Sequence, residues 1–124
     1  ELGFLGGLED DEALANAKAL AVHVEKVLKR PVTLVDTAHR PIKTIAWCTG
    51  GAQGYFEAAI AAGADAFITG EISEPQAHYA REMGVAFLAC GHHATERYGA
   101  PAVAEHVAAQ LGLQHEFIDI DNPA

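Results

Sequence analysis

The chain has 124 residues, half of them hydrophobic, and its 17 acidic and 8 basic residues give a net charge of −9. This length and composition are sufficient for one domain with a buried core. The charge argues against non-specific nucleic-acid binding, because a phosphate backbone is bound by a basic stripe and the sequence has none. Every apolar stretch is interrupted well before the ~18 residues that a membrane span needs, so we expect no membrane segment.

The first predicted element is a helix over residues 11–29. Apolar residues repeat there at intervals of three and four, which is typical of a helix with one buried face. Asp10 is the expected N-cap, and Pro31 stops the helix. Residues 32–35 are predicted to form a short strand.

From residue 42 onward, predicted strands and helices alternate. The order is strand 42–48, helix 53–62, strand 65–69, helix 74–83, strand 85–89, helix 100–111 and strand 116–120. Ser73 is the expected cap of the third helix, with Pro75 in its first turn, and Pro101 starts the fourth. The alternation implies right-handed crossovers, and hence an α/β fold with a largely parallel sheet and flanking helices. We expect residues 1–124 to form one domain, or one half of a larger fold.

The two cysteines, Cys48 and Cys90, each end an apolar, strand-like run. We expect both to be small core residues of a reduced cytoplasmic protein, without a disulfide between them. The alternative is a nucleophilic Cys90, since His92 follows the same strand, but a thiol at this point is expected to face the core.

Polar or small residues follow three of the predicted strands at the point where each strand ends. These loops begin at Thr49, Gly70 and Gly91. In open parallel sheets, ligands bind in the crevice at the carboxyl ends of the strands. We therefore expect a functional site at this edge, although turn glycines alone would also place small residues after each strand.

His92 and Glu96 are four residues apart, so a helical turn places both side chains on one face. An imidazole nitrogen and a carboxylate at this spacing can close on a single divalent cation. The alternative is the start of a helix, in which His92 or Thr95 caps free amides and Glu96 is favoured by the helix dipole. We predict that the side chains of His92 and Glu96 converge at the carboxyl edge of the sheet.

Four other residues are candidates for the same pocket. Glu71 directly follows a buried strand and a glycine, and it is the candidate catalytic residue, as a general acid/base or a water-positioning group. Its alternative role is to cap the next helix. We expect Glu71 to open onto the same crevice as His92, because adjacent strands lie only ~4.8 Å apart. Thr69, His78 and His93 are further pocket candidates, although a helix histidine such as His78 is usually structural or solvent-facing.

Longer motifs point to a known family. They are Thr69–Glu74, His78, Ala80–Glu82, Gly91–Arg97 and Phe117–Pro123. Over nearly the whole chain these segments resemble the YbgI-like family, known as GTP cyclohydrolase 1 type 2 homologues or Nif-three-like dinuclear metal proteins. The resemblance implies that His92 and Glu96 are metal ligands. Relatives often carry an aromatic residue at the position of His93, so it implies no ligand role there.

The resemblance also implies what the chain lacks. Family members are about twice this length, and their amino-terminal half supplies a His-His pair and an Asp that complete a site for two divalent ions (Zn, Fe or Mn). Nothing in this sequence matches that half, so we expect the carboxyl-terminal half of a larger Nif-three-like fold. With only two ligands, we expect this chain to bind metal weakly. We also expect it to self-associate through the surface that the other half would cover.

The leading functional hypothesis is that this chain is part of a metal-dependent hydrolase. The enzyme would act on a small nucleotide-like or phosphorylated molecule through metal-activated water. The cyclohydrolase activity is implied by resemblance alone, and no residue here identifies GTP. The rival is a metal-stabilised assembly without turnover, since the resemblance implies a homo-oligomer in the form of a ring-shaped hexamer. A third hypothesis is an α/β domain without activity.

Overall fold

The structure is a computed structural model that describes residues 3–9, 14–36 and 40–124. Its elements, in chain order, are β1 (Phe4–Gly7), α1 (Ala17–Leu28), β2 (Thr33–Val35), β3 (Thr44–Trp47), the 3-10 helix η1 (Gln53–Tyr55), α2 (Phe56–Ala61), β4 (Ala66–Thr69), α3 (Glu74–Met83), β5 (Ala86–Ala89), α4 (His92–Glu96) and α5 (Gly99–Leu111). No helix in these described ranges is long and apolar enough to cross a membrane.

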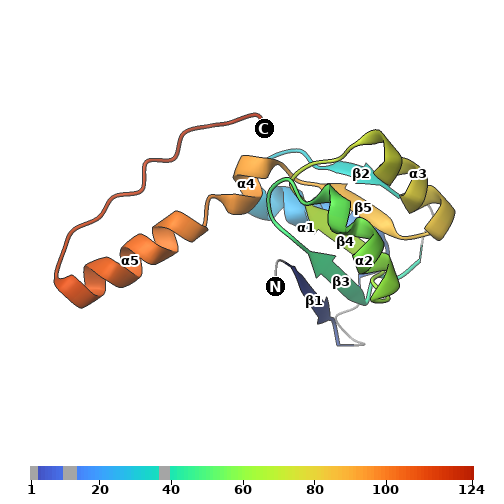
Figure 1. The fold of residues 1–124 in the computed structure, drawn as a ribbon, viewed down its shortest axis with the longest axis horizontal. Coiled ribbons are helices and arrows are strands. Elements are labelled where there is room, and N and C mark those ends of the chain that lie inside the picture. The colour runs from blue at the N-terminus through green and yellow to red at the C-terminus, as the bar shows by residue number, and fades with distance from the viewer. Residues whose placement is uncertain (1–2, 10–13, 37–39) are drawn as a thin grey trace.

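Five strands form one sheet in the order β1-β3-β4-β5-β2 (Figure 1). The central strands β3, β4 and β5 are parallel to one another, as the alternation of strands and helices predicts. Both edge strands, β1 and β2, are antiparallel to their neighbours, so the sheet is mixed and the expectation of a largely parallel sheet was wrong at its edges. The direction of an edge strand depends on the side from which the chain arrives, and local sequence patterning does not encode that side.

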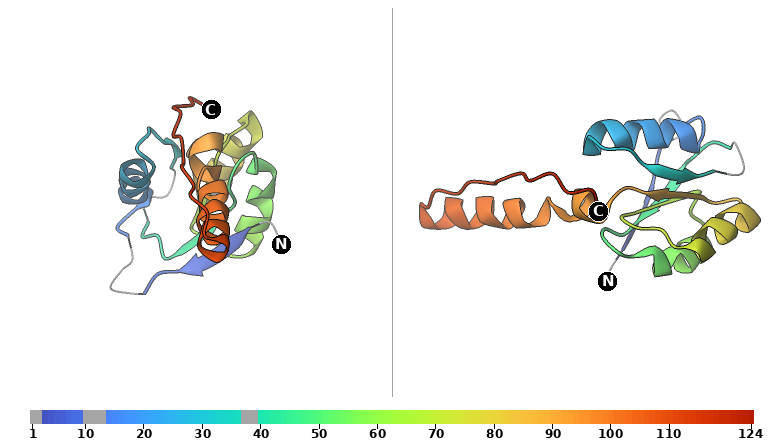
Figure 2. Two further views of the ribbon diagram at one scale, coloured as in Figure 1. Left: turned by 90° about the vertical axis from the view of Figure 1, so that its left-hand side faces the viewer. Right: turned by 90° about the horizontal axis from the view of Figure 1, so that it is seen from above.

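Helices cover both faces of the sheet (Figure 2). On one face, Leu20 of α1 belongs to the same core cluster as Leu88 of β5. On the other face, covered by α2 and α3, the ring of Phe56 contacts those of Phe67 and Phe87. Side chains alternate along a strand, so consecutive residues of β5 reach both cores, and all four are buried.

The first helix is shorter than the predicted helix 11–29. It begins after Asn16, whose side-chain oxygen accepts a hydrogen bond from the backbone N–H of Ala19 at 3.0 Å. Leu14, inside the predicted helix, instead forms an antiparallel bridge with a residue near β3. A cap at Asn16 and a backbone bridge therefore replace the first helical turn. Asp10, the predicted cap, lies outside the described residues.

The second half of the chain follows the predicted pattern more closely. The helix α3 has the predicted bounds 74–83, and Pro75 lies in its first turn. Ser73 occupies the N-cap position, but its side chain makes no capping hydrogen bond. Gly84, at φ +66, ends the helix in the left-handed region that favours glycine. The helix predicted at 53–62 is divided into η1 and α2.

The helix α5 and the tail that follows it, residues 113–124, project away from the sheet (Figures 1 and 2). The tail runs back along α5 towards α4. The prediction of a strand at 116–120 was wrong, because these residues form no strand. A strand needs a neighbour that satisfies its backbone groups, and within the described residues none pairs with the tail. Its apolar side chains are exposed, with Ile118 at 71% and Ile120 at 70%.

Candidate metal site

The loops that follow β4 and β5 lie against the loop that follows β3 at one edge of the sheet. The Gly70 N–H donates to the Gly50 carbonyl oxygen, and the Gly91 N–H donates to the Gly70 carbonyl oxygen, each at 2.9 Å. A Cβ atom at Gly70 would lie 2.6 Å from the Gly50 carbonyl oxygen and 2.7 Å from the Cα atom of His92. Glycine at this position therefore lets the loops approach closely, and their closeness brings together the side chains that they carry.

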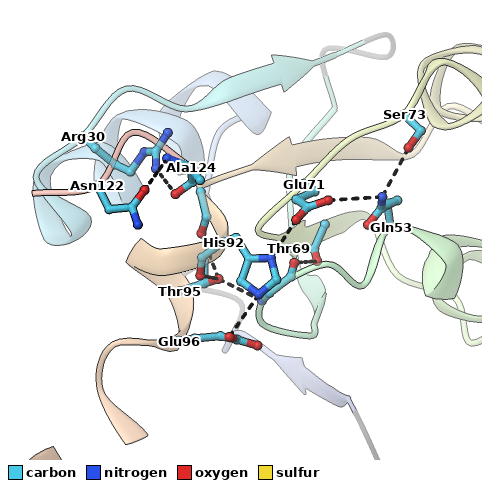
Figure 3. Close-up of polar contacts among 12 residues, drawn as sticks. Arg30, Gln53, Thr69, Glu71, Ser73, His92, Thr95, Glu96, Asn122 and Ala124 are labelled. Carbon is cyan, nitrogen blue, oxygen red and sulfur yellow. Dashed lines mark hydrogen bonds and ion pairs between the residues drawn. The ribbon is translucent and has the colours of Figure 1, made fainter. Parts of the chain in front are cut away.

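His92 lies between two carboxylates at this edge (Figure 3). Its Nδ1 atom is 2.6 Å from Oε1 of Glu71, and its Nε2 atom is 3.1 Å from Oε2 of Glu96. All three side chains are partly exposed, so the group is open to solvent. The predicted convergence of His92 and Glu96 on one side of a helical turn is confirmed, and so is the position of Glu71 beside them.

The short helix α4 places His92 and Glu96 one turn apart, and Thr95 ties this helix to the loop after β3. The Thr95 hydroxyl accepts a hydrogen bond from the Gly50 N–H at 2.9 Å and lies within donating distance of the Gly91 carbonyl oxygen, also at 2.9 Å. Gly50 has φ +71, and a side chain there would overlap the Glu96 carboxylate. Glycine at position 50 therefore leaves room for the carboxylate beside His92.

The separation between His92 and Glu96 fits one divalent ion. Two ligand atoms that each lie ~2.0–2.2 Å from a shared ion are roughly 3 Å apart, as Nε2 and Oε2 are. Glu71 contacts Nδ1, on the opposite side of the imidazole ring from Nε2. It is therefore not placed to bind the same ion as Nε2 and Glu96. Within the described residues, no group of three or more His, Cys, Asp and Glu side chains is placed to hold a metal ion. Among the described residues, His92 and Glu96 are thus two candidate ligands, and Glu71 is a carboxylate that contacts the imidazole ring of His92.

The contact between Glu71 and His92 shifts the pKa of both groups. The hydrogen bond with His92 lowers the pKa of Glu71, and the hydrogen bond with Glu71 raises the pKa of His92, with the charge of Glu96 acting in the same direction. The imidazolium form of His92 is therefore favoured between the two carboxylates. A metal ion at Nε2 would have to displace a proton, so metal binding by this candidate site would depend on pH.

Gln53 also contacts this group, although the sequence pattern did not single it out. Its Nε2 atom lies 3.2 Å from Oγ of Ser73 and 3.5 Å from Oε2 of Glu71. Glu71 is thereby held at both oxygens, one by His92 and the other by Gln53 (Figure 3). The available signal was the position of Gln53 at the end of the glycine-containing loop that follows β3.

Thr69 and His78 are not brought into contact with His92. Thr69 is fully buried and donates its hydroxyl to the Gly50 carbonyl oxygen at 3.2 Å, so it joins two loops. His78 is exposed on α3, with its Nε2 atom 3.9 Å from Oε1 of Glu74. A role in the site for either residue stays a prediction.

His93 and the two cysteines have other surroundings than His92 and Glu96, the candidate ligands. His93 lines a separate cavity between α4 and the tail. Cys48 and Cys90 are buried and form no disulfide, in agreement with the expected core positions. Burial raises the pKa of the Cys90 thiol to about 12, which disfavours the thiolate that a nucleophile needs.

The family comparison agrees with the motifs. The family model described as Duf34/NIF3 (NGG1p interacting factor 3) matches residues 1–123. The chain belongs to the Duf34/NIF3 family. Its α/β fold, with a mixed sheet of five strands and flanking helices, is accordingly part of a fold found in other members of the family.

Curated relatives of this Duf34/NIF3 chain are longer than it is. The "GTP cyclohydrolase 1 type 2 homolog" of Pseudomonas aeruginosa is 56% identical over 104 residues, which are 84% of this chain and 41% of the relative. The protein of the same name from Yersinia pestis is 56% identical over 110 residues, or 88% of this chain and 44% of the relative. The chain thus spans less than half the length of these relatives.

Solved structures share its fold. Protein ybgI, described as of unknown function, matches with a TM-score of 0.91 and 43% identity, over 99% of this chain and 49% of that chain. A Bacillus cereus protein related to NIF3 matches with a TM-score of 0.80 and 24% identity, over 100% of this chain and 35% of that chain. These matches extend over the projecting helix α5 as well as the sheet.

Proposed function

We propose that this chain supplies two ligands, His92 and Glu96, to a divalent-metal site of a longer Duf34/NIF3 protein. The observation that supports this proposal is the 3.1 Å separation between Nε2 of His92 and Oε2 of Glu96, with Nδ1 already held by Glu71. The family resemblance drawn from the motifs implies a centre of two such ions. The proposed activity is metal-dependent hydrolysis of a small nucleotide-like or phosphorylated molecule.

A bound divalent ion would act as a Lewis acid and would lower the pKa of a water molecule that it binds. The residues of this chain would orient its ligands. A carboxylate that accepts the Nδ1–H of His92 directs the Nε2 lone pair outward, towards Glu96. We therefore assign Glu71 first to positioning His92. An acid/base role for Glu71 would require its Oε1 atom to leave this hydrogen bond.

The proposed site is incomplete within the described residues, because a catalytic zinc-type site usually has three protein ligands. The relatives are more than twice as long as the segments that match this chain, so they have room for further ligands. We propose that the remaining ligands come from that additional sequence. Two ligands on one helical turn would leave an ion mostly hydrated, so binding by this chain alone should be weak.

A second candidate function is a metal-stabilised homo-oligomer without turnover, for which the family resemblance implies a hexameric ring. Exposed apolar side chains on α5 and the tail favour an assembly of some kind, notably Leu111 at 68% and Ile118 at 71%. The two functions make different demands on the metal. Hydrolysis requires an exchangeable water on the ion, whereas an assembly requires only that the ion holds the subunits in place.

Calorimetric titration of the chain with Zn²⁺ and with Mn²⁺ tests the ligand assignment. We expect weak binding that is lost in His92→Ala and unchanged in the control His106→Ala, which removes an exposed histidine of α5. Binding that survives His92→Ala would contradict the assignment. Stoichiometric, sub-micromolar binding by the unaltered chain would contradict the claim that the site is incomplete.

The full-length Pseudomonas aeruginosa relative separates the two functions. Hydrolysis of a phosphorylated substrate that depends on added metal, and is lost when the histidine aligned with His92 is replaced, would support the first. Oligomers that require the metal but show no hydrolysis across nucleotide and phosphate-ester substrates would support the second.

A further inference from the structure

A separate cavity of about 590 Å³ lies between the end of α1, the helix α4 and the tail. Lys29 and Arg30 line it from the end of α1, and His93 and Arg97 line it from α4 and the residue after it. Three of the chain's eight Lys and Arg residues are therefore gathered at one cavity of a protein with net charge −9. Asp119 and Asp121 line the same cavity, and Asp119 is paired with Arg97, so Lys29 and Arg30 are the cationic groups that remain available to attract an anion.

Two of the groups that line the cavity carry unused hydrogen-bonding capacity. The Nε atom of Arg30 and the Nε2 atom of His93 are both buried from solvent, and neither has a hydrogen-bond partner in the described part of the chain. Buried polar atoms without a partner are uncommon in folded proteins. Their presence in one cavity indicates that an additional acceptor can be accommodated there.

The tail already places oxygen atoms against other donors of the same two residues, and Figure 3 shows the contact between Arg30 and Ala124. Nη1 of Arg30 donates to the Ala124 carbonyl oxygen at 2.9 Å, and Nη2 donates to the Pro123 carbonyl oxygen at 3.2 Å. The backbone N–H of His93 donates to the same Ala124 oxygen at 3.2 Å. A guanidinium fork with a neighbouring backbone N–H is an arrangement that also binds the oxygens of a phosphate or carboxylate group.

The cavity lies next to the proposed metal ligands. The Arg30 guanidinium packs so closely on Gly91 that a Cβ atom there would overlap it. Gly91 directly precedes His92, and His93 follows it, so the cavity and the proposed metal site share the helix α4. A molecule with an anionic group in the cavity would therefore have its remaining atoms near the turn that carries His92.

We propose that Arg30, Lys29 and His93 form a binding site for an oxyanion, specifically the phosphate group of a small phosphorylated molecule, which replaces the tail's carbonyl oxygens. Phosphate suits the site because its oxygens can accept from the Arg30 fork and from the His93 backbone N–H together. The assignment of this phosphate to the substrate rests on the proposed function. The binding of phosphate does not, since none of these groups is a proposed metal ligand.

The tail disfavours phosphate binding in this cavity. Arg97 donates to both carboxylate oxygens of Asp119 at 3.2 Å, and Asp119 and Asp121 line the cavity. These carboxylates repel an anion, and the ion pair holds the tail over the site. Substitution of Asp119 should therefore strengthen phosphate binding, because it removes a negative charge and also releases the tail.

The test is an NMR titration of the metal-free chain with inorganic phosphate, in which the Arg30 Nε–H and His93 signals are followed. We expect saturable shifts, binding weakened about tenfold in Arg30→Gln by loss of a charge-assisted hydrogen bond, and tighter binding in Asp119→Asn. Arg81→Gln is the matched control, because it removes an equal charge from an exposed position on α3. It should leave the affinity unchanged.

Lys29→Asn is a second variant in case the loss of Arg30 disturbs the tail. Lys29 has φ +57, and asparagine tolerates this left-handed conformation, so the fold should be kept while phosphate binding weakens. NMR shifts that do not saturate with phosphate, or a loss of phosphate affinity in Arg81→Gln equal to that in Arg30→Gln, would contradict the proposed site. Acetate binding as tight as phosphate binding would overturn the assignment to phosphate. Because the titration contains no metal, a failure of the metal proposal would leave its result unchanged.

Discussion

The edge of the sheet around His92 and the projecting arm formed by α5 and the tail are built in opposite ways. At the sheet edge, loops from three strands are joined by backbone hydrogen bonds, and the spacing is so close that Gly70 has no room for a side chain. In the arm, a helix of 13 residues exposes most of its side chains. The end of the tail is held mainly through Arg30 and Arg97.

This contrast separates positions that the chain fixes by its own packing from positions that depend on a few polar contacts. An isolated helix of this length is only marginally stable in water, so an arm of this kind gains most of its stability from whatever covers it. The side chains of the sheet edge are positioned by a packed core beneath them. We therefore expect substitutions in the core beneath the edge, and at the closely packed Gly70, to have large effects on stability, and those in the arm to have small ones.

The largest expected difference is between Phe87→Ala and Leu111→Ala. Phe87 is fully buried, and its ring lies 4.9 Å from that of Phe56, so its truncation should lower the free energy of unfolding by about 3–5 kcal/mol. Leu111 is 68% exposed on α5, and its truncation should change that free energy by less than about 0.5 kcal/mol. Urea unfolding followed by circular dichroism measures both. Equal losses would show that the arm belongs to the same cooperative core.

Glycine substitutions give a second, smaller contrast. An alanine at Gly70 would press on backbone atoms of Gly50 and His92, and we expect it to destabilise the chain by about 1–3 kcal/mol. Gly99, the first residue of α5, has nothing within 4 Å of an added Cβ atom. Gly99→Ala should be neutral or slightly stabilising, because alanine favours helix. Thermal unfolding of the two variants compares them directly, and a destabilising Gly99→Ala would contradict the account of the arm.

The proposed role of Glu71 predicts a graded effect on metal binding. Loss of a carboxylate that supports a histidine ligand typically weakens metal affinity by about tenfold or more. We expect Glu71→Ala to show this loss in Zn²⁺ titrations of the chain, and Glu71→Gln to retain part of the affinity because its amide oxygen can still accept from Nδ1. Equal affinities in the unaltered chain and Glu71→Ala would exclude the positioning role.

The hydrogen bond between Glu71 and His92 predicts that the stability of the fold depends on pH. The pKa of His92 is raised from 6.5, so its contribution is fully present below about pH 6.5 and is lost as the pH rises through the folded-state value. The pKa of Glu71 is lowered from 4.5, so its contribution is present above about pH 4.5 and is lost as the pH falls through its folded-state value. Both side chains are partly exposed, so the effect should be small and sensitive to salt.

The measurement is the difference in Tm between the unaltered chain and Glu71→Gln across the pH range. We expect it to be greatest between about pH 4.5 and 6.5 and to shrink on either side. Glu116→Gln, which removes a carboxylate from the exposed tail, serves as the control and should show no such maximum. A difference that is constant with pH would mean that Glu71 stabilises the fold without pairing with His92.

Features that depend on residues close together in the chain could be predicted from the sequence. The bounds of α3 follow from a proline in its first turn and a glycine after its end, and the buried strands follow from short apolar runs. The placement of His92 and Glu96 on one face follows from a spacing of four residues in a helical turn. The motifs of these segments also indicated the family, and the match to the family model confirms that assignment.

Contacts that join distant parts of the chain could not be predicted from the sequence, because they depend on how the whole chain packs. Glu71 reaches His92 across 21 residues, and Arg30 reaches Ala124 across 94, and no local pattern encodes either separation. The antiparallel edge strands of the sheet and the unpaired tail likewise depend on contacts between distant parts of the chain. A strand is completed by a partner, and whether a partner lies beside residues 116–120 depends on the packing of the whole molecule, whereas their alternating sequence records only the tendency to be extended.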